Sequence, residues 1–245
     1  MLSKTKEKVF GLVGHSLNLL VSEDELFMPN QVTKEFTKAV KINQGDVVFD
    51  IGSGVGPLAI WSGYEPSSRV YGVEIVPEQC EVARENVRRN KLQDKVEIYE
   101  GSFFDPLPEN VKNEKADVII ADLSGISEKI ARVLGWYPVR IPTGGRDGTD
   151  VINSVLEKAG KYLKEGGRLY FPIAGLSCYK KIMEKSILYF NSLVEKINAN
   201  FPLTSDQVES INRLELHSSN YELKAKGTRT IWKGWIFEAK NPILR

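Results

Sequence analysis

The chain has 245 residues, a length that suits one α/β domain with small additions and would be cramped for two full domains. Hydrophobic residues make up 42% of the chain and charged residues 27%, which excludes disordered, collagen-like and coiled-coil proteins. The 33 basic and 32 acidic side chains leave a formal net charge of +1, so the molecule as a whole lacks the basic field that drives non-specific nucleic-acid binding.

The beginning of the chain and its cysteines show no sign of membrane insertion, disulfide bonding or metal binding. No run approaches the roughly 20 apolar residues that span a bilayer, and the short apolar run near the N-terminus lacks a convincing cleavage site. We therefore expect a cytoplasmic protein without a membrane partner. Cys80 and Cys178 lie far apart, without metal-ligand spacing, and the chain has only 2 histidines. These features predict no disulfide framework, no metal site and no histidine-based triad.

In chain order, residues 1–41 are predicted to form a lead-in or cap, and residues 42–245 to form the main domain. Four apolar runs rich in β-branched residues follow, at residues 46–51, 69–75, 95–99 and 116–121. Such runs suit strands that are buried on both faces, as in parallel sheets. After the second run, residues 77–90 predict an amphipathic helix whose first turn contains Pro77.

The second half of the chain continues the alternation of helices and strands. The pattern predicts helices over residues 149–163 and 179–190 and from Ser205 onward, and strands over residues 168–173, 193–199 and 230–238. Together the elements predict a doubly wound, Rossmann-like α/β fold with a seven-stranded, mostly parallel sheet and an antiparallel last strand. Residues 205–228 are a candidate insertion before that strand. In such sheets ligands bind at the carboxyl ends of the strands, where the strand order reverses.

A glycine-rich turn, Asp50-Ile-Gly-Ser-Gly-Val-Gly-Pro57, follows the first predicted strand. Its three glycines allow a tight turn and let backbone N–H groups approach a ligand. A dinucleotide site would have its third glycine where Pro57 stands, which makes a nucleotide-dependent oxidoreductase the weaker alternative. The spacing resembles motif I of the class I S-adenosylmethionine-dependent methyltransferases. This resemblance implies S-adenosyl-L-methionine as the cofactor, bound through Asp50, Gly52, Ser53, Gly54 and Gly56.

Two further segments match the cofactor motifs of the same class. Glu74 ends the second predicted strand, 22 positions after Gly52, where a carboxylate can accept hydrogen bonds from both ribose hydroxyls or simply be a solvated charge. Ile75 follows it among the expected cofactor contacts. The segment after the third strand resembles the adenine-contacting part of the family. It has Ser102 where many members have aspartate, and Phe103 as a cover for the adenine ring or as a core residue.

Within this class, two stretches resemble the release-factor glutamine methyltransferases and their relatives. Pro29, Asn30 and Thr33 belong to a segment that is similar to their Phe-x-Pro-x-x-x-Thr lead-in and are candidate substrate contacts. Residues 144–150 are similar to their Gly-Gly-x-Asp-Gly segment. The fourth strand ends in Asp122-Leu-Ser-Gly, where those enzymes have Asn-Pro-Pro-Tyr. Some ribosomal-protein methyltransferases also lack this motif, so the resemblance implies an amine, amide or hydroxyl acceptor on a protein or small molecule.

Asp122 is the candidate catalytic residue. A sulfonium methyl group is already activated, so its transfer needs an aligned acceptor and exclusion of water rather than a protein nucleophile or a metal. A carboxylate at this strand end can orient an amine or take a proton from a hydroxyl or ammonium group. The alternative is that Asp122 caps the following turn. Candidates for a substrate wall, or for packing alone, are Trp136, Tyr137 and Arg140 in the loop after this strand.

Two other functions are compatible with these cofactor motifs. An RNA methyltransferase needs a basic surface with aromatic residues, for which the candidates are Lys224, Lys226, Arg229, Lys233, Trp232 and Trp235. On a terminal pair of strands such residues more often form a solvated edge, so nucleic acid is a less favoured partner. A non-catalytic protein that keeps the cofactor-binding fold is the second alternative. The oligomeric state is left open.

Overall fold

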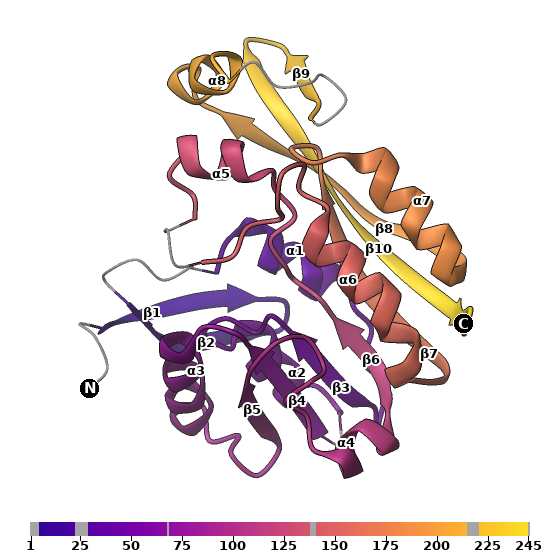
Figure 1. The fold of residues 1–245 in the computed structure, drawn as a ribbon. Helices are drawn as coiled ribbons and strands as arrows, with labels where there is room; N and C mark the ends of the chain where they lie inside the picture. Colours follow the sequence, from indigo (N-terminus) through magenta and orange to yellow (C-terminus); the bar gives the residue numbers. More distant parts are fainter. Residues whose placement is uncertain (1–4, 23–28, 68, 138–140, 215–220, 245) are drawn as a thin grey trace. The chain divides into compact units, whose positions relative to one another are not determined.

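The computed structural model describes residues 5–22, 29–67, 69–137, 141–214 and 221–244 (Figure 1). The chain divides into two compact units. The first unit consists of Met1–Asp122 and Lys161–Tyr170, and the second unit consists of Leu123–Gly160 and Phe171–Arg245. All of the predicted cofactor contacts belong to the first unit.

The first unit contains the strands that the four apolar runs predict, joined by helices. Its strands are β1 (Thr5–Leu12), β2 (His15–Ser22), β3 (Val47–Ile51), β4 (Arg69–Glu74), β5 (Val96–Glu100), β6 (Ala116–Ile120) and the first part of β7 (Leu163–Ala174). Its helices are α1 (Gln31–Ala39), α2 (Pro57–Tyr64), α3 (Pro77–Arg89) and α4 (Glu109–Glu114). The bounds of β3 to β6 and of α3 differ from the predicted ones by no more than one residue at either end.

The strands of the first unit that follow the hairpin form a parallel sheet in the order β5-β4-β3-β6-β7. All residues of β3 are buried, as a strand covered on both faces requires. Asp50 on β3 is in register with Gly72 on β4 and with Ile120 on β6. Glu74 is the last residue of β4, and Gly52 and Asp122 come directly or almost directly after the ends of β3 and β6, so all three belong to the carboxyl edge of the sheet. The strand order reverses between β3 and β6, which is where open α/β sheets bind ligands.

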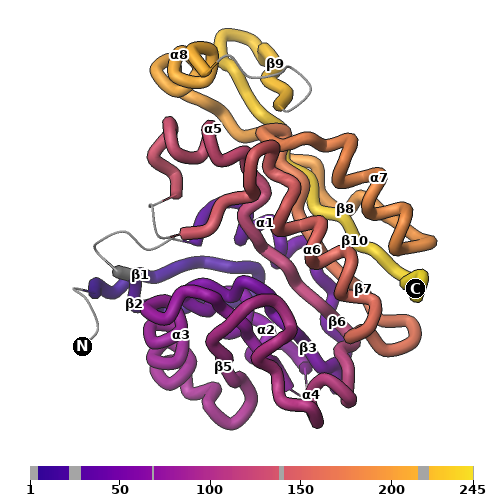
Figure 2. Tube along the Cα trace, in the orientation of Figure 1, coloured from indigo at the N-terminus to yellow at the C-terminus, as the bar shows by residue number. Residues whose placement is uncertain are grey.

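An antiparallel hairpin of β1 and β2 precedes the parallel sheet in the chain (Figure 2). The sequence predicts only a lead-in here, because the charged residues of β1 hide the alternation of a strand and a clear alternation is confined to β2. Along β2, Leu17, Leu19 and Val21 are fully buried. The turn contains Gly14 with φ +77°, a conformation that side chains disfavour. The hairpin packs through β2 against α2 and α3.

The second unit is built from antiparallel strands and helices. Its strands are the end of β7, β8 (Phe190–Leu203), β9 (Leu223–Lys226) and β10 (Arg229–Pro242), and its helices are α5 (Glu128–Val133), α6 (Asp150–Ala159), α7 (Tyr179–Tyr189) and α8 (Ser205–Asn212). Strand β10 pairs antiparallel with both β8 and β9. The strand order β5-β4-β3-β6-β7-β10-β8, with β9 on β10, gives a mostly parallel sheet with an antiparallel end. The predicted fold class is confirmed, and β9 brings the main sheet to eight strands among the described residues.

The helix predicted over residues 149–163 is shorter in the structure. Helix α6 ends at Ala159, a 3₁₀ turn (Gly160–Tyr162) follows, and β7 begins at Leu163. Glycine at position 160 is a poor helix former, and Leu163 pairs instead with Ala116 on β6. The boundary after residue 41 and the insertion over residues 205–228 stay predictions.

None of the helices in the described part of the chain combines the length and the apolar character that crossing a membrane requires.

Candidate functional site

The glycine-rich turn leaves β3 in a conformation that glycine adopts without strain. Gly52, Gly54 and Gly56 have φ values of +78°, +56° and +88°. The N–H groups of Gly52 and Ser53 donate to the carbonyl oxygen of Val73 at 2.8 and 2.9 Å, which fastens the start of the turn to β4. Gly56 then forms the N-cap of α2. Backbone hydrogen bonds therefore hold the turn, and it presents little side-chain bulk to a ligand.

Glu74 joins this turn to the connection that follows β4. Its Oε2 accepts a hydrogen bond from the Gly54 N–H and its Oε1 accepts one from the Val76 N–H, both at 2.9 Å. The residue is only 7% exposed. Burial raises the pKa of the Glu74 carboxyl, although hydrogen bonds from the backbone N–H groups of Val76, Gly54 and Ile75 oppose the rise. Because each carboxylate oxygen can accept more than one hydrogen bond, Glu74 keeps capacity for further donors.

Asp50 lies on β3 two residues before Gly52, and neither carboxylate oxygen has a hydrogen bond of ordinary geometry, although the N–H of Ala59 interacts with the group. The residue is 1% exposed. Burial is the main cause of a rise in the pKa of Asp50 to about 8, and the neighbouring charge of Asp122 adds to it, as Glu74 does to a smaller extent, while the N–H of Ala59 opposes it. Unpartnered polar groups in a protein interior are rare, and a charged one is costly. This carboxyl group therefore favours its neutral form in the chain without ligands.

The predicted adenine contacts follow the ends of β4 and β5. The apolar side chain of Ile75 is 49% exposed. Ser102 and Phe103 are half-buried, and Phe103 has φ +52°, which is uncommon outside glycine. The aromatic core residue is instead Phe104, which is fully buried and stacks on Tyr162 with 4.3 Å between ring centroids. Ile75 and Phe103 thus leave apolar surface accessible near Glu74.

Asp122 is hydrogen-bonded to the lead-in helix α1. The Thr33 hydroxyl donates to Asp122 Oδ2 at 2.7 Å, across 89 positions in sequence. Thr33 is 2% exposed. Burial raises the pKa of Asp122 to about 6, and the hydrogen bond from Thr33 opposes the rise. The structure therefore brings together a predicted substrate contact and the predicted catalytic residue, a contact that the sequence analysis does not predict.

Asn30 and Thr33 also form the start of α1. Asn30 Oδ1 accepts from the Val32 N–H at 2.7 Å, and Thr33 Oγ1 accepts from the Asn30 N–H at 3.4 Å, which completes a capping box. The Thr33 hydroxyl thus accepts from the helix cap and donates to Asp122. Pro29 is buried immediately before the cap, and residues 23–28 of the lead-in lie outside the described residues.

The other two candidate substrate residues belong to the second unit. Trp136 lies against Trp232, with 6.1 Å between ring centroids. Tyr137 is buried, and its carbonyl oxygen accepts a hydrogen bond from Arg132 at 3.0 Å. These contacts are those expected of packing residues. The substrate wall that the sequence suggests for Trp136 and Tyr137 stays a prediction, and Arg140 of the same loop lies outside the described residues.

The Gly-Gly-x-Asp-Gly segment opens α6, as expected, and its aspartate is fully engaged. Asp147 accepts hydrogen bonds from the Thr149 hydroxyl and from Lys181 Nζ, and its carbonyl oxygen accepts from the Cys178 N–H. Burial by itself raises the pKa of Asp147, but the hydrogen bonds from Lys181 and Thr149 outweigh it and leave the pKa below its ordinary value. In this second unit the segment therefore has the features of a structural turn.

Two amides on α3 escape the sequence analysis. Gln79 and Asn86 are buried, and both fall on the helix face that carries Ala83. A side chain added at Gly54 would lie 3.3 Å from Gln79 Oε1, so Gln79 borders the glycine-rich turn. The sequence feature that could have identified them is a pair of amide side chains at helical spacing on an otherwise apolar helix face. Such amides are buried, and buried amides need hydrogen-bond partners.

Comparisons with known proteins agree with this geometry. A family model described as a methyltransferase domain matches residues 42–218. The chain is 36% identical over 125 residues to the ribosomal protein L11 methyltransferase of Alkaliphilus oremlandii, a match that covers 49% of this chain and 38% of that protein. It is 29% identical over 168 residues to the release factor glutamine methyltransferase of Thermosynechococcus vestitus, covering 65% of this chain and 57% of that protein.

A solved structure shows the same fold at lower sequence identity. The tRNA m1G37 methyltransferase of M. jannaschii superimposes with a TM-score of 0.53 at 17% identity, covering 96% of this chain and 57% of that one. The family match includes the glycine-rich turn, Glu74 and Asp122. The chain therefore belongs to the methyltransferase-domain family, as a class I methyltransferase of the S-adenosylmethionine-dependent type.

Proposed function

We propose that this chain binds S-adenosylmethionine at the carboxyl ends of β3, β4 and β6 and transfers its methyl group to an amine, amide or hydroxyl acceptor. The observation that carries the proposal is that Gly52, Glu74 and Asp122 all lie at the carboxyl ends of β3, β4 and β6, the edge where the strand order reverses. Methyl transfer from this cofactor needs three parts close together. They are a glycine turn that the cofactor can approach, a carboxylate that accepts hydrogen bonds from the ribose hydroxyls, and a carboxylate that orients the molecule to be methylated.

The residues present fit this cofactor. Glu74 has hydrogen-bonding capacity for ribose hydroxyls, and the exposed Ile75 and half-buried Phe103 offer apolar surface to an adenine ring. Asp50, Asp122 and Glu74 are close enough for both other acids to raise the pKa of Asp50. A ligand with a sulfonium and an ammonium group would relieve this repulsion. The glycines at positions 52, 54 and 56 leave the backbone open to approach.

The bound cofactor supplies a methyl group that its sulfonium already activates. The work left for the protein is to align the acceptor and to exclude water. Thr33 uses one hydrogen-bonding position of Asp122, and the carboxylate retains others for an N–H or O–H of the acceptor. Asp122 then orients the acceptor or takes its proton.

A protein or small molecule remains the preferred acceptor class. The chain spans 38% and 57% of the two curated relatives, whose names specify a ribosomal protein and a release factor. These names support a protein acceptor. The tRNA methyltransferase shares the fold at 17% identity, which carries no argument for RNA. The basic residues that are candidates for RNA binding belong to the second unit, where Lys224 pairs with Glu222 and Lys233 lies over the Trp235 ring. These two lysines therefore already have partners within the chain.

Calorimetry with S-adenosylmethionine, S-adenosylhomocysteine and NAD tests the cofactor. We expect both sulfur compounds to bind, and Glu74→Ala to weaken binding by about 1.5–3 kcal/mol because hydrogen bonds to a charged group are lost. Glu100→Ala is the matched control and should leave binding unchanged. Glu100 is the register partner of Glu74 on the neighbouring strand β5, but it is exposed. Tight NAD binding without a response to either sulfur compound would contradict the proposal. Transfer from radiolabelled cofactor to separated protein, RNA and metabolite fractions then identifies the acceptor class.

A further inference from the structure

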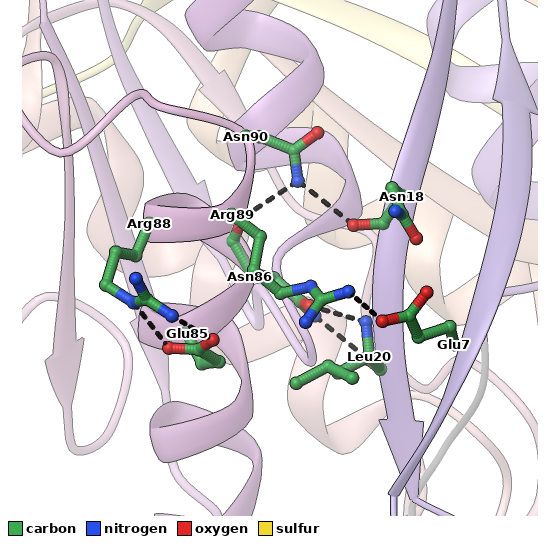
Figure 3. Close-up of polar contacts among 8 residues, drawn as sticks. All are labelled: Glu7, Asn18, Leu20, Glu85, Asn86, Arg88, Arg89 and Asn90. Carbon is green, nitrogen blue, oxygen red and sulfur yellow. Dashed lines mark hydrogen bonds and ion pairs between the residues drawn. The ribbon is translucent and has the colours of Figure 1, made fainter.

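The buried Asn86 side chain connects two parts of the first unit that are far apart in sequence. Its Oδ1 accepts a hydrogen bond from the Leu20 N–H at 2.6 Å, and its Nδ2 donates to the Leu20 carbonyl at 3.0 Å (Figure 3). The same Nδ2 donates to the carbonyl oxygen of Val55 at 2.9 Å. Leu20 belongs to β2 of the hairpin, and Val55 lies between Gly54 and Gly56 in the glycine-rich turn.

These three hydrogen bonds use both N–H donors of the amide and its oxygen. Asn86 is 0% exposed, so water cannot replace a lost partner. When β2 is docked on α3, two bonds to Leu20 determine the plane of the amide, and the remaining N–H points at Val55. The orientation of this N–H therefore depends on the hairpin.

The Val55 carbonyl group is placed so that a hydrogen bond to it can fix the backbone conformation of the turn. It belongs to the planar peptide that also contains the Gly56 N–H, which donates to the Ser53 carbonyl at 2.8 Å. Glycines on either side of Val55 give the turn many accessible backbone conformations, and fixing one of them costs entropy. A hydrogen bond to Val55 holds this peptide plane before a ligand arrives.

The other polar contacts between α3 and the hairpin do not involve the turn. Asn90 Nδ2 donates to the Asn18 carbonyl at 3.2 Å, and Arg89 forms an ion pair with Glu7 (Figure 3). Both lie nearer the surface than Asn86, and Arg89 is the last residue of α3 while Asn90 is its C-cap, so substitutions at either loosen hairpin contacts without removing the bond to Val55.

We propose that Asn86 is a positioning residue through which docking of the β1–β2 hairpin preorganises the glycine-rich turn for the cofactor. The inference rests on the proposed function for the identity of the ligand, but the coupling itself is a property of the chain alone. A preorganised turn binds more tightly because less ordering remains to be done on binding. Cofactor affinity thus depends on a hairpin outside the parallel sheet.

Two measurements on the full chain test the proposal. Amide hydrogen exchange of residues 53–56 is followed in the chain without added ligand, and the dissociation constant of S-adenosylhomocysteine is measured by calorimetry. Asn86→Ala should speed exchange in the turn and weaken binding about tenfold or more, because buried partners lose their hydrogen bonds. Asn90→Ala should stay within about twofold of the wild type in both, as expected for an exposed contact.

A second pair of variants tests the role of the hairpin itself and covers the case in which Asn86→Ala does not fold. Leu17→Ala removes a fully buried side chain of β2, and Leu156→Ala makes the same change in α6 of the second unit. The proposal expects Leu17→Ala, but not Leu156→Ala, to speed exchange in residues 53–56 and to weaken binding.

The outcomes separate this proposal from the proposed function. Unchanged exchange and affinity in Asn86→Ala and Leu17→Ala would overturn the coupling. An effect of Asn86→Ala without one of Leu17→Ala would also overturn it, since Asn86 would then hold the turn without help from the hairpin. If the wild type binds neither sulfur compound, the proposed function fails, while the exchange measurements still decide whether hairpin and turn are coupled.

Discussion

The chain has two glycine-rich segments that carry an aspartate, and they differ in how the carboxylate is partnered. In the first unit, Asp50 precedes the turn over residues 52–56, has no side-chain partner and no hydrogen bond of ordinary geometry, and has a raised pKa. In the second unit, Asp147 lies within residues 144–150, is hydrogen-bonded to Thr149 and Lys181, and has a lowered pKa. Both segments have glycines at positive φ, and both resemble family motifs.

The difference teaches that glycine spacing alone does not identify a ligand site. An acid whose hydrogen-bonding capacity is used by its own chain stabilises a turn and has little left for a ligand. A buried acid without partners costs folding free energy, so its retention calls for another explanation, such as an interaction with a ligand. We therefore propose a ligand-binding role for the turn at residues 52–56 and a structural role for the segment at residues 144–150.

The largest effect should come from filling the first turn. Gly54→Val forces a β-branched side chain onto a residue with φ +56° and toward Gln79, so cofactor binding should be lost. Gly45→Val is the control, because Gly45 has φ +81° and open space around its missing side chain. Calorimetry and circular dichroism on both variants give the answer. If Gly54→Val binds the cofactor as the control does, the turn is not the binding site.

The next largest effect concerns Asp122. Asp122→Asn keeps the shape and removes the charge, so turnover should fall by about 10²-fold or more while cofactor affinity is retained. The pKa of about 6 also predicts that the rate of the wild type rises with pH through this value, because the charged form is the proton acceptor. Thr33→Val removes the hydrogen bond that lowers this pKa and should move the rise to higher pH. Wild-type turnover in Asp122→Asn would return the residue to a capping role, since Asn caps as well as Asp.

The pH dependence of stability sharpens the contrast between the two aspartates. The pKa of Asp50 is raised from 3.8 to about 8, so the folded chain holds a proton that the unfolded chain releases above pH 4. Its contribution to stability is present at pH 4 and is lost as pH rises through about 8. Thermal denaturation is measured without cofactor from pH 4 to pH 8. Across this range the melting temperature of the wild type should fall relative to that of Asp50→Asn, because only the wild type loses this contribution. A constant difference between the two curves would show that Asp50 is charged in the folded state.

The smallest effect is expected at Asp147. Asp147→Asn weakens its ion pair with the partly exposed Lys181 and should lower stability by about 1 kcal/mol. For a chain of this size the melting temperature should fall by roughly 2–4 °C. Cofactor affinity should be unchanged, because the residue is engaged by its own chain. A tenfold loss of affinity would break the distinction between the two segments.

The sequence by itself determined the order of strands and helices along the chain and the positions of the cofactor motifs at the strand ends. Strands β3 to β6 and helix α3 were predictable because apolar periodicity, Pro77 and the glycines act on neighbouring residues. The turn after β3 and the place of Glu74 and Asp122 at strand ends follow from the same local signals. The shorter α6 and the added β9 show where local signals were too weak to set boundaries or short pairings.

Only the tertiary structure decided which polar groups meet. Thr33 and Asp122 are 89 positions apart, and Asn86 joins Leu20 to Val55 across 66 and 31 positions. No periodicity encodes such pairs, because they depend on how separate elements pack and on which buried donors and acceptors then come within reach. For the same reason the sequence could not show that Asp147 has side-chain hydrogen-bond partners and that Asp50 lacks them. Those contacts, more than the glycine pattern, distinguish the candidate site from a structural turn.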